Sequence, residues 1–352
     1  SYPVVLIKGT LDVTDPDLPP SVSWVEQNRR NHTHSIEAIN LTSPSPRQIY
    51  KAAMYQHNFK VLVELVPGKN QIQLDSSKVR KTLVLNYKPM QAKFRVRFIY
   101  MTDKSGATQY PTQEPNDPQD YKNKIDVLAK LMQCFVAEEM NEGGFGRKTF
   151  HFDVEANGKA RVITTKLPYS REMLSGKGIF DIWRIVHHDI SEHMRDEHMI
   201  DLVITSFATY DPKRKKAFGY TAAGAPGTAA VTNLGMFSWP STVTQVPIAF
   251  SDTEWIDENL IFNQSGYRDT HWALASTTMG AAFHELGHAL FFVHDSDDLC
   301  IMSTGYSLFH RQFMVEDSPS KISIFPEFYA HKQEALISPL MLHQMNQHAW
   351  IK

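Results

Sequence analysis

The segment "HELGHALFFVHD", residues 284–295, contains three histidines and one glutamate at spacings that suit a metal ion. His284 and His288 are four residues apart, so on an α-helix both imidazoles lie on one face, one turn apart. Two neutral imidazoles at about 2.0–2.1 Å suit Zn²⁺. Glu285 flanks the metal without binding it. It is positioned to take a proton from a water on the zinc, whose pKa the metal lowers to roughly 7.

A catalytic zinc needs a third protein ligand and one open position. His294, six residues after His288, is the first candidate for that ligand. The carboxylates that could replace it are Asp295, Asp297, Asp298 and Glu327. A structural motif that holds no metal is a further interpretation, but it requires all of these spacings to be accidental.

The spacing resembles that of the metzincin clan of zinc endopeptidases, whose pattern is His-Glu-x-x-His-x-x-Gly-x-x-His followed by a tight turn with a methionine beneath the metal. The residues that match the pattern are His284, Glu285, His288 and His294. Met302, in "CIMSTGY", follows eight residues later, and the resemblance implies that it is an apolar, polarisable floor for the site. In some metzincins a tyrosine just after the methionine stabilises the substrate oxyanion. Tyr306 is the candidate here at a different spacing, and a packed loop tyrosine is the alternative.

Phe291 occupies the position where the metzincin pattern has glycine. A glycine there turns the chain sharply, and backbone with positive φ is costly for phenylalanine. We therefore expect one of two outcomes. Either the helix runs one turn further and unwinds at Val293, still delivering His294, or His294 misses the metal and a carboxylate replaces it.

Three stretches, "SYPVVLIKGT", "LVPGKNQI" and "AAFHELGHALFFVHD", together resemble a family of fungal zinc metallopeptidases. The resemblance covers most of the chain and implies a zincin fold, a zinc cofactor and peptidase activity. Longer members of that family carry a jacalin-like lectin domain after the protease, whereas this sequence ends at "MNQHAWIK" without one.

The hydrophobic patterns predict an α+β protein of two domains, residues 1–91 and 92–352. Short β-branched runs with Gly, Pro and Asn turns predict an N-terminal all-β sandwich. In the second part strands alternate with long helices, which predicts a zincin catalytic domain with a twisted mixed sheet and an active-site helix. Asp269 or Thr270 can cap that helix. We also expect strands over residues 148–156 and 159–167, and an amphipathic helix over 326–350 with a break near Pro339.

The segment "TAAGAPGTAAVTNLG", residues 221–235, has two interpretations. It could be the sheet edge on which an extended substrate lies, or a surface loop.

Composition limits the classes of partner and the use of cysteine. With 21% charged residues and a formal net charge of −2, the chain favours neither nucleic acid nor a membrane surface. No run of about 18 apolar residues suggests a membrane span. Two cysteines, Cys134 and Cys300, exclude a disulfide scaffold, and free buried thiols are favoured over one bridge. Few cysteines favour a cytoplasmic chain and three Asn-x-Ser/Thr sequons favour secretion, so the compartment stays open.

The sequence therefore predicts a zinc-dependent endopeptidase that acts on a peptide or protein. Glu285 is the expected general base, and afterwards the general acid for the leaving amine. The alternative is a non-catalytic zincin scaffold that recognises a protein or glycan ligand, because Phe291 could crowd the third ligand or fill part of the cleft. A zinc hydrolase of non-peptide amides is a third interpretation.

Overall fold

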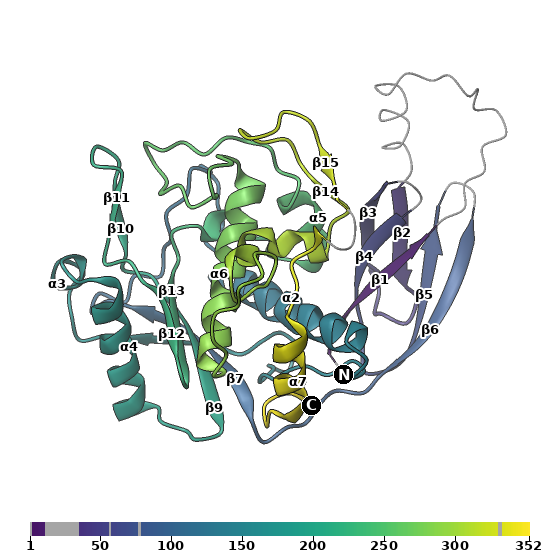
Figure 1. The fold of residues 1–352 in the computed structure, drawn as a ribbon, viewed down its shortest axis with the longest axis horizontal. Coiled ribbons are helices and arrows are strands. Elements are labelled where there is room, and N and C mark those ends of the chain that lie inside the picture. Colours follow the sequence, from purple (N-terminus) through teal and green to yellow (C-terminus); the bar gives the residue numbers. More distant parts are fainter. Residues whose placement is uncertain (1, 11–34, 56–57, 77–78, 330–332) are drawn as a thin grey trace.

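The computed structural model describes residues 2–10, 35–55, 58–76, 79–329 and 333–352 of the chain (Figure 1). The sequon at residues 31–33 lies outside these ranges. Among the described residues, strands of the N-terminal part are followed by a mixed arrangement of strands and helices. The mixed α and β architecture expected from the sequence is confirmed.

The N-terminal part forms a six-stranded antiparallel sheet in the order β1-β4-β3-β2-β5-β6. Its strands are β1 (Val4–Thr10), β2 (Ser35–Asn40), β3 (Ile49–Tyr55), β4 (Asn58–Glu64), β5 (Gly68–Asp75) and β6 (Arg80–Tyr87). Gly68 begins β5 with φ of 96°, a conformation that glycine adopts freely. The all-β character is as expected, while the packing of two layers as a sandwich stays a prediction.

The second part is built on a five-stranded sheet in the order β12-β13-β9-β7-β8. Its strands are β7 (Arg95–Thr102), β8 (Val162–Lys166), β9 (Met199–Thr205), β12 (Ala222–Ala225) and β13 (Thr228–Thr232). Four of them are parallel, and β12 pairs with β13 in the antiparallel sense, so the sheet is mixed and β12 lies at its edge. A separate hairpin joins β10 (Thr209–Asp211) to β11 (Lys216–Phe218).

Helices cover both faces of this sheet (Figure 1). On one face lie α2 (Tyr121–Glu142) and α6 (His271–Ala289), and on the other lie α3 (Arg171–Ser175) and α4 (Ile179–His193). Alternate residues of one strand point to opposite faces. Phe98 of β7 accordingly packs in the cluster with α2 and α6, whereas its neighbour Ile99 packs with α4. The larger cluster continues into β1 and β4, so one hydrophobic core joins the N-terminal sheet to α2.

The remaining elements follow the sheet or connect its helices. They are α5 (Val246–Ala249), α7 (Pro339–Gln347), the two-stranded pair β14 (Glu316–Asp317) and β15 (Glu327–Phe328), and the 3₁₀ segments η1 (Met236–Ser238), η2 (Val243–Gln245) and η3 (Thr304–Gln312).

Three local predictions were wrong. Residues 148–156 make isolated bridges at Phe150, Phe152 and Val154 but no strand. Among the described residues of the tail, the helix begins at Pro339, and residues 327–328 pair as β15 instead. Thr270 stands at the N-cap of α6, yet no side chain caps the helix. The carbonyl oxygens of Glu254 and Asp252 accept the first-turn N–H bonds instead.

Cys134 and Cys300 are both free and buried, as the composition favoured. In the described part of the chain, no helix is both long and apolar enough to cross a bilayer.

Candidate zinc site

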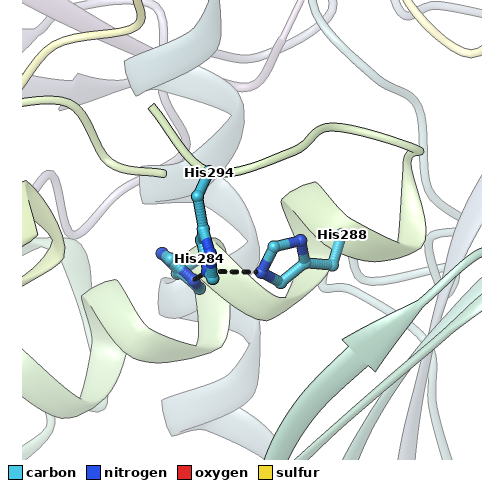
Figure 2. A group of neighbouring side chains, drawn as sticks. All are labelled: His284, His288 and His294. Atoms are coloured by element: carbon cyan, nitrogen blue, oxygen red, sulfur yellow. Dashed lines mark hydrogen bonds between the residues drawn. The ribbon is translucent and has the colours of Figure 1, made fainter. Parts of the chain in front are cut away.

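The side chains of His284, His288 and His294 converge beside α6 (Figure 2). The Nε2 atom of His294 lies 3.2 Å from Nε2 of His284 and 3.1 Å from Nε2 of His288. The two α6 histidines lie one turn apart on the same face, as the spacing predicts, and His294 approaches from the segment after the helix. The structure thus brings all three predicted ligand side chains together.

Backbone carbonyl groups fix the orientation of both helix histidines. Nδ1 of His284 is 2.8 Å from the oxygen of Ile301, and Nδ1 of His288 is 2.9 Å from the oxygen of Phe292. A carbonyl oxygen only accepts, so each Nδ1 must donate its proton. In the neutral ring Nε2 then carries a lone pair, which a metal requires. The same arrangement orients metal-binding imidazoles generally.

The spacing of the three nitrogens fits a tetrahedral zinc ion. Ligands at about 2.0–2.1 Å in tetrahedral geometry lie about 3.3–3.4 Å from one another. The observed distances from His294 are within a few tenths of an ångström of that value. Burial, opposed in part by the hydrogen bond to Ile301, lowers the pKa of His284 to about 4, and burial also lowers the pKa of His288. Both rings are therefore neutral near pH 7, as metal binding requires.

Phe291 adopts the positive-φ backbone conformation that we expected to be costly for any residue but glycine. The helix ends at Ala289, and Phe291 has φ of 72°. Its N–H donates to the oxygen of His288 at 3.0 Å, and the N–H of Phe292 donates to the oxygen of Gly287 at 2.9 Å. These two bonds make a Schellman motif with a phenylalanine at its left-handed position. The first expected outcome was wrong about the path, because α6 ends at Ala289 and does not run on to Val293, but His294 does reach the other two imidazoles as that outcome required. The second outcome, in which His294 misses the site, was wrong.

Met302 lies against α6 at the level of the site. It is buried, and a Cβ atom on Gly287 would lie 2.2 Å from its Sδ atom. Only a glycine allows the helix to come this close to the methionine. The preceding residue, Ile301, supplies the carbonyl that holds His284. The turn bearing Met302 thus supports the first histidine by packing and by a hydrogen bond.

Glu285 faces the edge strand of the sheet. Its carboxylate accepts a hydrogen bond from the backbone N–H of Gly224 in β12, and burial raises its pKa to about 7. A Cβ on Gly224 would lie 2.3 Å from the carbonyl oxygen of Glu285, so this position of β12 accommodates only glycine. The sequence did not single out Gly224, because the contact joins residues 61 positions apart in the numbering.

A cavity of about 690 Å³ opens beside the histidines and Glu285. Its walls come from the segment entering β12, from the loop before α6, from α6 itself and from η3. The lining residues outside the predicted ligands include Tyr220, Ala222, Gln264, Gly266, Thr277, Thr278, Ala281, Ser303 and Tyr306. It is large enough for parts of an extended peptide rather than one small ion.

Two tyrosines line this cavity. The ring of Tyr306 lies 5.5 Å from that of His284, so the structure brings this predicted residue to the site. Tyr220 was missed by the sequence reasoning. Burial, and then the charges of Glu285 and Tyr306, raise the pKa of Tyr220 to about 12, so its hydroxyl keeps its proton near neutral pH. A tyrosine before a Gly- and Ala-rich edge strand was the available signal.

The Arg268 side chain donates hydrogen bonds to three segments that form walls of the cavity. This buried side chain donates to the oxygen of Ser265 at 2.9 Å, to Oγ1 of Thr277 at 2.9 Å and to the oxygen of Ser307 at 2.8 Å. These acceptors belong to the loop before α6, to α6 and to η3. The residue next to Ser307 is Tyr306, so Arg268 fixes the position of the tyrosine-bearing segment relative to the helix.

The carboxylates considered as substitutes do not converge on the imidazoles. Among the described residues, the histidine trio is one of two groups of potential metal ligands, the other being Glu114, Glu254 and His271 at the start of α6. Glu327 pairs with Asp317 between β15 and β14. Asp295 lines the cavity, but its side chain accepts a hydrogen bond from the N–H of Asp297.

A family model described as "Putative peptidase family" matches residues 1–352. The chain belongs to this family. A "putative zinc metalloproteinase" of Schizosaccharomyces pombe is 27% identical over 285 residues, covering 74% of this chain and 45% of that protein. One of Saccharomyces cerevisiae with the same description is 22% identical over 304 residues, covering 75% of this chain and 43% of that protein. The resemblance to fungal zinc metallopeptidases is confirmed, and the chain spans less than half the length of these two relatives.

Among solved structures, the chain is similar to OgpA from Akkermansia muciniphila at 14% identity, covering 72% of this chain and 65% of that chain, with a TM-score of 0.42. It is similar to archaemetzincin from Methanopyrus kandleri at 12% identity, covering 73% of this chain and 98% of that chain, with a TM-score of 0.30. Both likenesses are distant.

Proposed function

We propose that this member of the peptidase family is a zinc-dependent endopeptidase whose metal is bound by His284, His288 and His294. One observation carries the proposal. The Nε2 atoms of His284 and His288, whose Nδ1 atoms are bound to backbone carbonyls, lie 3.2 and 3.1 Å from Nε2 of His294, beside the half-buried Glu285. The cofactor is zinc, as the descriptions of the two yeast relatives also state for those proteins.

Zinc held by these imidazoles would lower the pKa of a water and would polarise a scissile carbonyl. Glu285 then acts as the general base for the attacking water and returns the proton to the leaving amine. A pKa near 7 suits both steps, because the carboxylate accepts a proton and releases it within the same cycle. The N–H of Gly224 orients the carboxylate through its hydrogen bond.

The substrate that suits this site is an extended peptide. Segment 222–225 is a strand at the edge of the sheet, which favours the first of its two sequence interpretations. The N–H of Gly224 faces the Glu285 carboxylate, so the edge of β12 that pairs with no strand of the described residues lies beside the proposed catalytic base. A peptide added to that edge would lie across the zinc by main-chain pairing.

Tyr306 is the proposed oxyanion stabiliser. Its ring packs edge-on against His284, and it lines the same cavity as Glu285. Gly280 permits this placement, since a Cβ there would lie 1.9 Å from the carbonyl oxygen of Tyr306. A hydroxyl on this wall of the cavity would donate to the charge that develops on the substrate oxygen.

The binding-only alternative rested on Phe291, and the geometry gives it no support. The ring is 59% exposed and is not among the residues that line the 690 Å³ cavity. It neither fills the cavity beside Glu285 nor displaces His294 from the other imidazoles.

Metal analysis of the purified chain tests the ligand set. Wild type is expected to hold about one zinc per chain, and His294→Ala is expected to bind zinc at least tenfold more weakly, since one of three ligands is lost. His343→Ala is a matched control in α7, because His343 is not a member of either convergent group of potential ligands. Full zinc affinity in His294→Ala would contradict the proposed coordination.

A further inference from the structure

Phe291 has an unfavourable backbone conformation that packing of its ring does not explain. Its φ of 72° suits glycine, yet its side chain is 59% exposed. The nearest aromatic ring to it is His348, with ring centroids 6.2 Å apart. Backbone strain of this kind persists where the surroundings hold it, and it concentrates at ligand-binding sites.

The ring lies at one end of the proposed substrate strand. Gly224 of β12 lies against Glu285 and His288, and Gly227 donates its N–H to the oxygen of Ala289 at 3.0 Å. Strand β12 and the end of α6 therefore run in the same direction along the cleft. Phe291 follows Ala289 by two residues, so it stands next to the turn between β12 and β13.

A second cavity, of about 490 Å³, lies at this turn. Pro226, Gly227, Phe291 and Trp350 line it, together with residues of α4, of the loop over 195–197 and of the start of β9. Its lining therefore combines these apolar side chains with charged ones from Arg195, Asp196, Glu197 and Asp201. Pro226 is two residues beyond Gly224, in the turn between β12 and β13, so it lies at most about 7 Å from Gly224. The cavity is thus within two or three peptide residues of the proposed catalytic base.

The direction in which the peptide chain runs decides which part of the substrate reaches this second cavity. Antiparallel pairing is the more stable arrangement for an added strand. A peptide antiparallel to β12 has its N-terminal residues toward Ala225 and Pro226. The residues before the scissile bond then approach Phe291, and those after it extend toward Ala222 and the 690 Å³ cavity.

We infer that Phe291 and Pro226 form the apolar wall of a subsite for a large hydrophobic side chain of the substrate, two or three residues on the N-terminal side of the scissile bond. This inference rests on the proposed peptidase function. It assigns the phenylalanine a role in selectivity, since a glycine would end the helix equally well and offer no ring. A difference of even one methylene in a hydrophobic pocket is typically worth about 10–200-fold in selectivity.

The test compares Phe291→Asn, Phe291→Leu and wild type on peptides that differ only at those two positions. Asparagine tolerates the left-handed conformation and removes the apolar ring, whereas leucine keeps an apolar side chain. We expect Phe291→Asn to lower kcat/KM about tenfold for peptides with Phe or Leu there and to leave Gly or Ala peptides unchanged. Phe291→Leu should retain most of the preference.

Tyr267→Asn is the matched control, because Tyr267 is also an exposed aromatic with positive φ, 67°. It precedes α6, whose 19 residues span about 28 Å. This variant should cleave the series with the preference of wild type.

Binding of the same peptides to zinc-loaded Glu285→Ala, measured by calorimetry, separates the two proposals. One outcome is that wild type cleaves none of the peptides, while Glu285→Ala binds the Phe and Leu peptides more tightly than the Gly and Ala peptides. That outcome contradicts peptidase function and supports the subsite. Cleavage with equal preference in Phe291→Asn and wild type overturns the subsite alone. A preference that follows residues after the scissile bond also overturns it, since the peptide would then run the other way.

Discussion

Gly287 and Met302 are in direct contact beside the candidate zinc site, with no room for even one methyl group between them. The two residues are 15 positions apart, and their approach lets Ile301 present its carbonyl to His284. The contact therefore links the support of the first imidazole to the packing of the turn that follows the motif.

Substitutions of Gly287 and Met302 should have coupled effects on stability. Gly287→Ala is expected to lower the free energy of unfolding by about 1–3 kcal/mol, because its Cβ would overlap the sulfur atom of Met302. Met302→Ala leaves a cavity and should cost about 2–5 kcal/mol. The double variant should lose less than the sum, since each change relieves the other. Urea denaturation of the three variants measures this, and strictly additive losses would contradict the direct contact.

Phe291→Gly should fold at least as well as wild type. A non-glycine residue in the left-handed region costs about 1–2 kcal/mol, while glycine adds about 0.5–1 kcal/mol of chain entropy to be lost. The net expectation is a gain of about 0.5–1 kcal/mol in the free energy of unfolding, since the exposed ring contributes little packing. Thermal denaturation at fixed zinc concentration checks it. A loss of more than about 1 kcal/mol would mean that the ring stabilises the fold.

Glu139 should make the stability depend on pH. It is buried in α2, where it accepts hydrogen bonds from Gln312 and from the N–H of Ile337, and burial raises its pKa to about 7. The folded chain therefore keeps a proton that the unfolded chain releases above about pH 4.5. The stabilisation is complete below pH 4.5 and is lost as the pH rises through 7.

Glu139→Gln removes this titration. Between pH 5 and 8, wild type should lose on the order of 1–3 kcal/mol of unfolding free energy relative to the variant. Glu155→Gln, at an exposed turn, is the control and should follow wild type. Denaturant titrations at several pH values measure the difference. Parallel curves for wild type and Glu139→Gln would contradict the assignment.

The motif could be predicted from the sequence because its geometry is local. The helical period alone puts His284 and His288 on one face, and the glutamate between them follows directly. Met302 and His294 could be added because they lie within 18 residues of the first histidine. Parts of the site that are distant in sequence were out of reach: nothing in local periodicity connects Gly224 or Arg268 to the helix.

Phe291 shows a different limit on what can be predicted from the sequence. Conformational preference correctly gives the cost of a positive φ at phenylalanine, but it does not show what offsets that cost. The two hydrogen bonds of the Schellman motif, made by Phe291 and Phe292, become visible only in the structure. The strand expected over residues 148–156 failed for a related reason, because the alternation is present but only single bridges find partners.

The central claim is that three imidazoles hold zinc while Glu285 moves the proton. It is tested most directly by measuring zinc content and hydrolysis of a mixed peptide library in the same preparations of wild type and Glu285→Gln. We predict about one zinc per chain in both proteins, and hydrolysis in the variant about 10²–10⁴-fold slower than in wild type. Equal rates in the two proteins, or loss of zinc from Glu285→Gln, would contradict it.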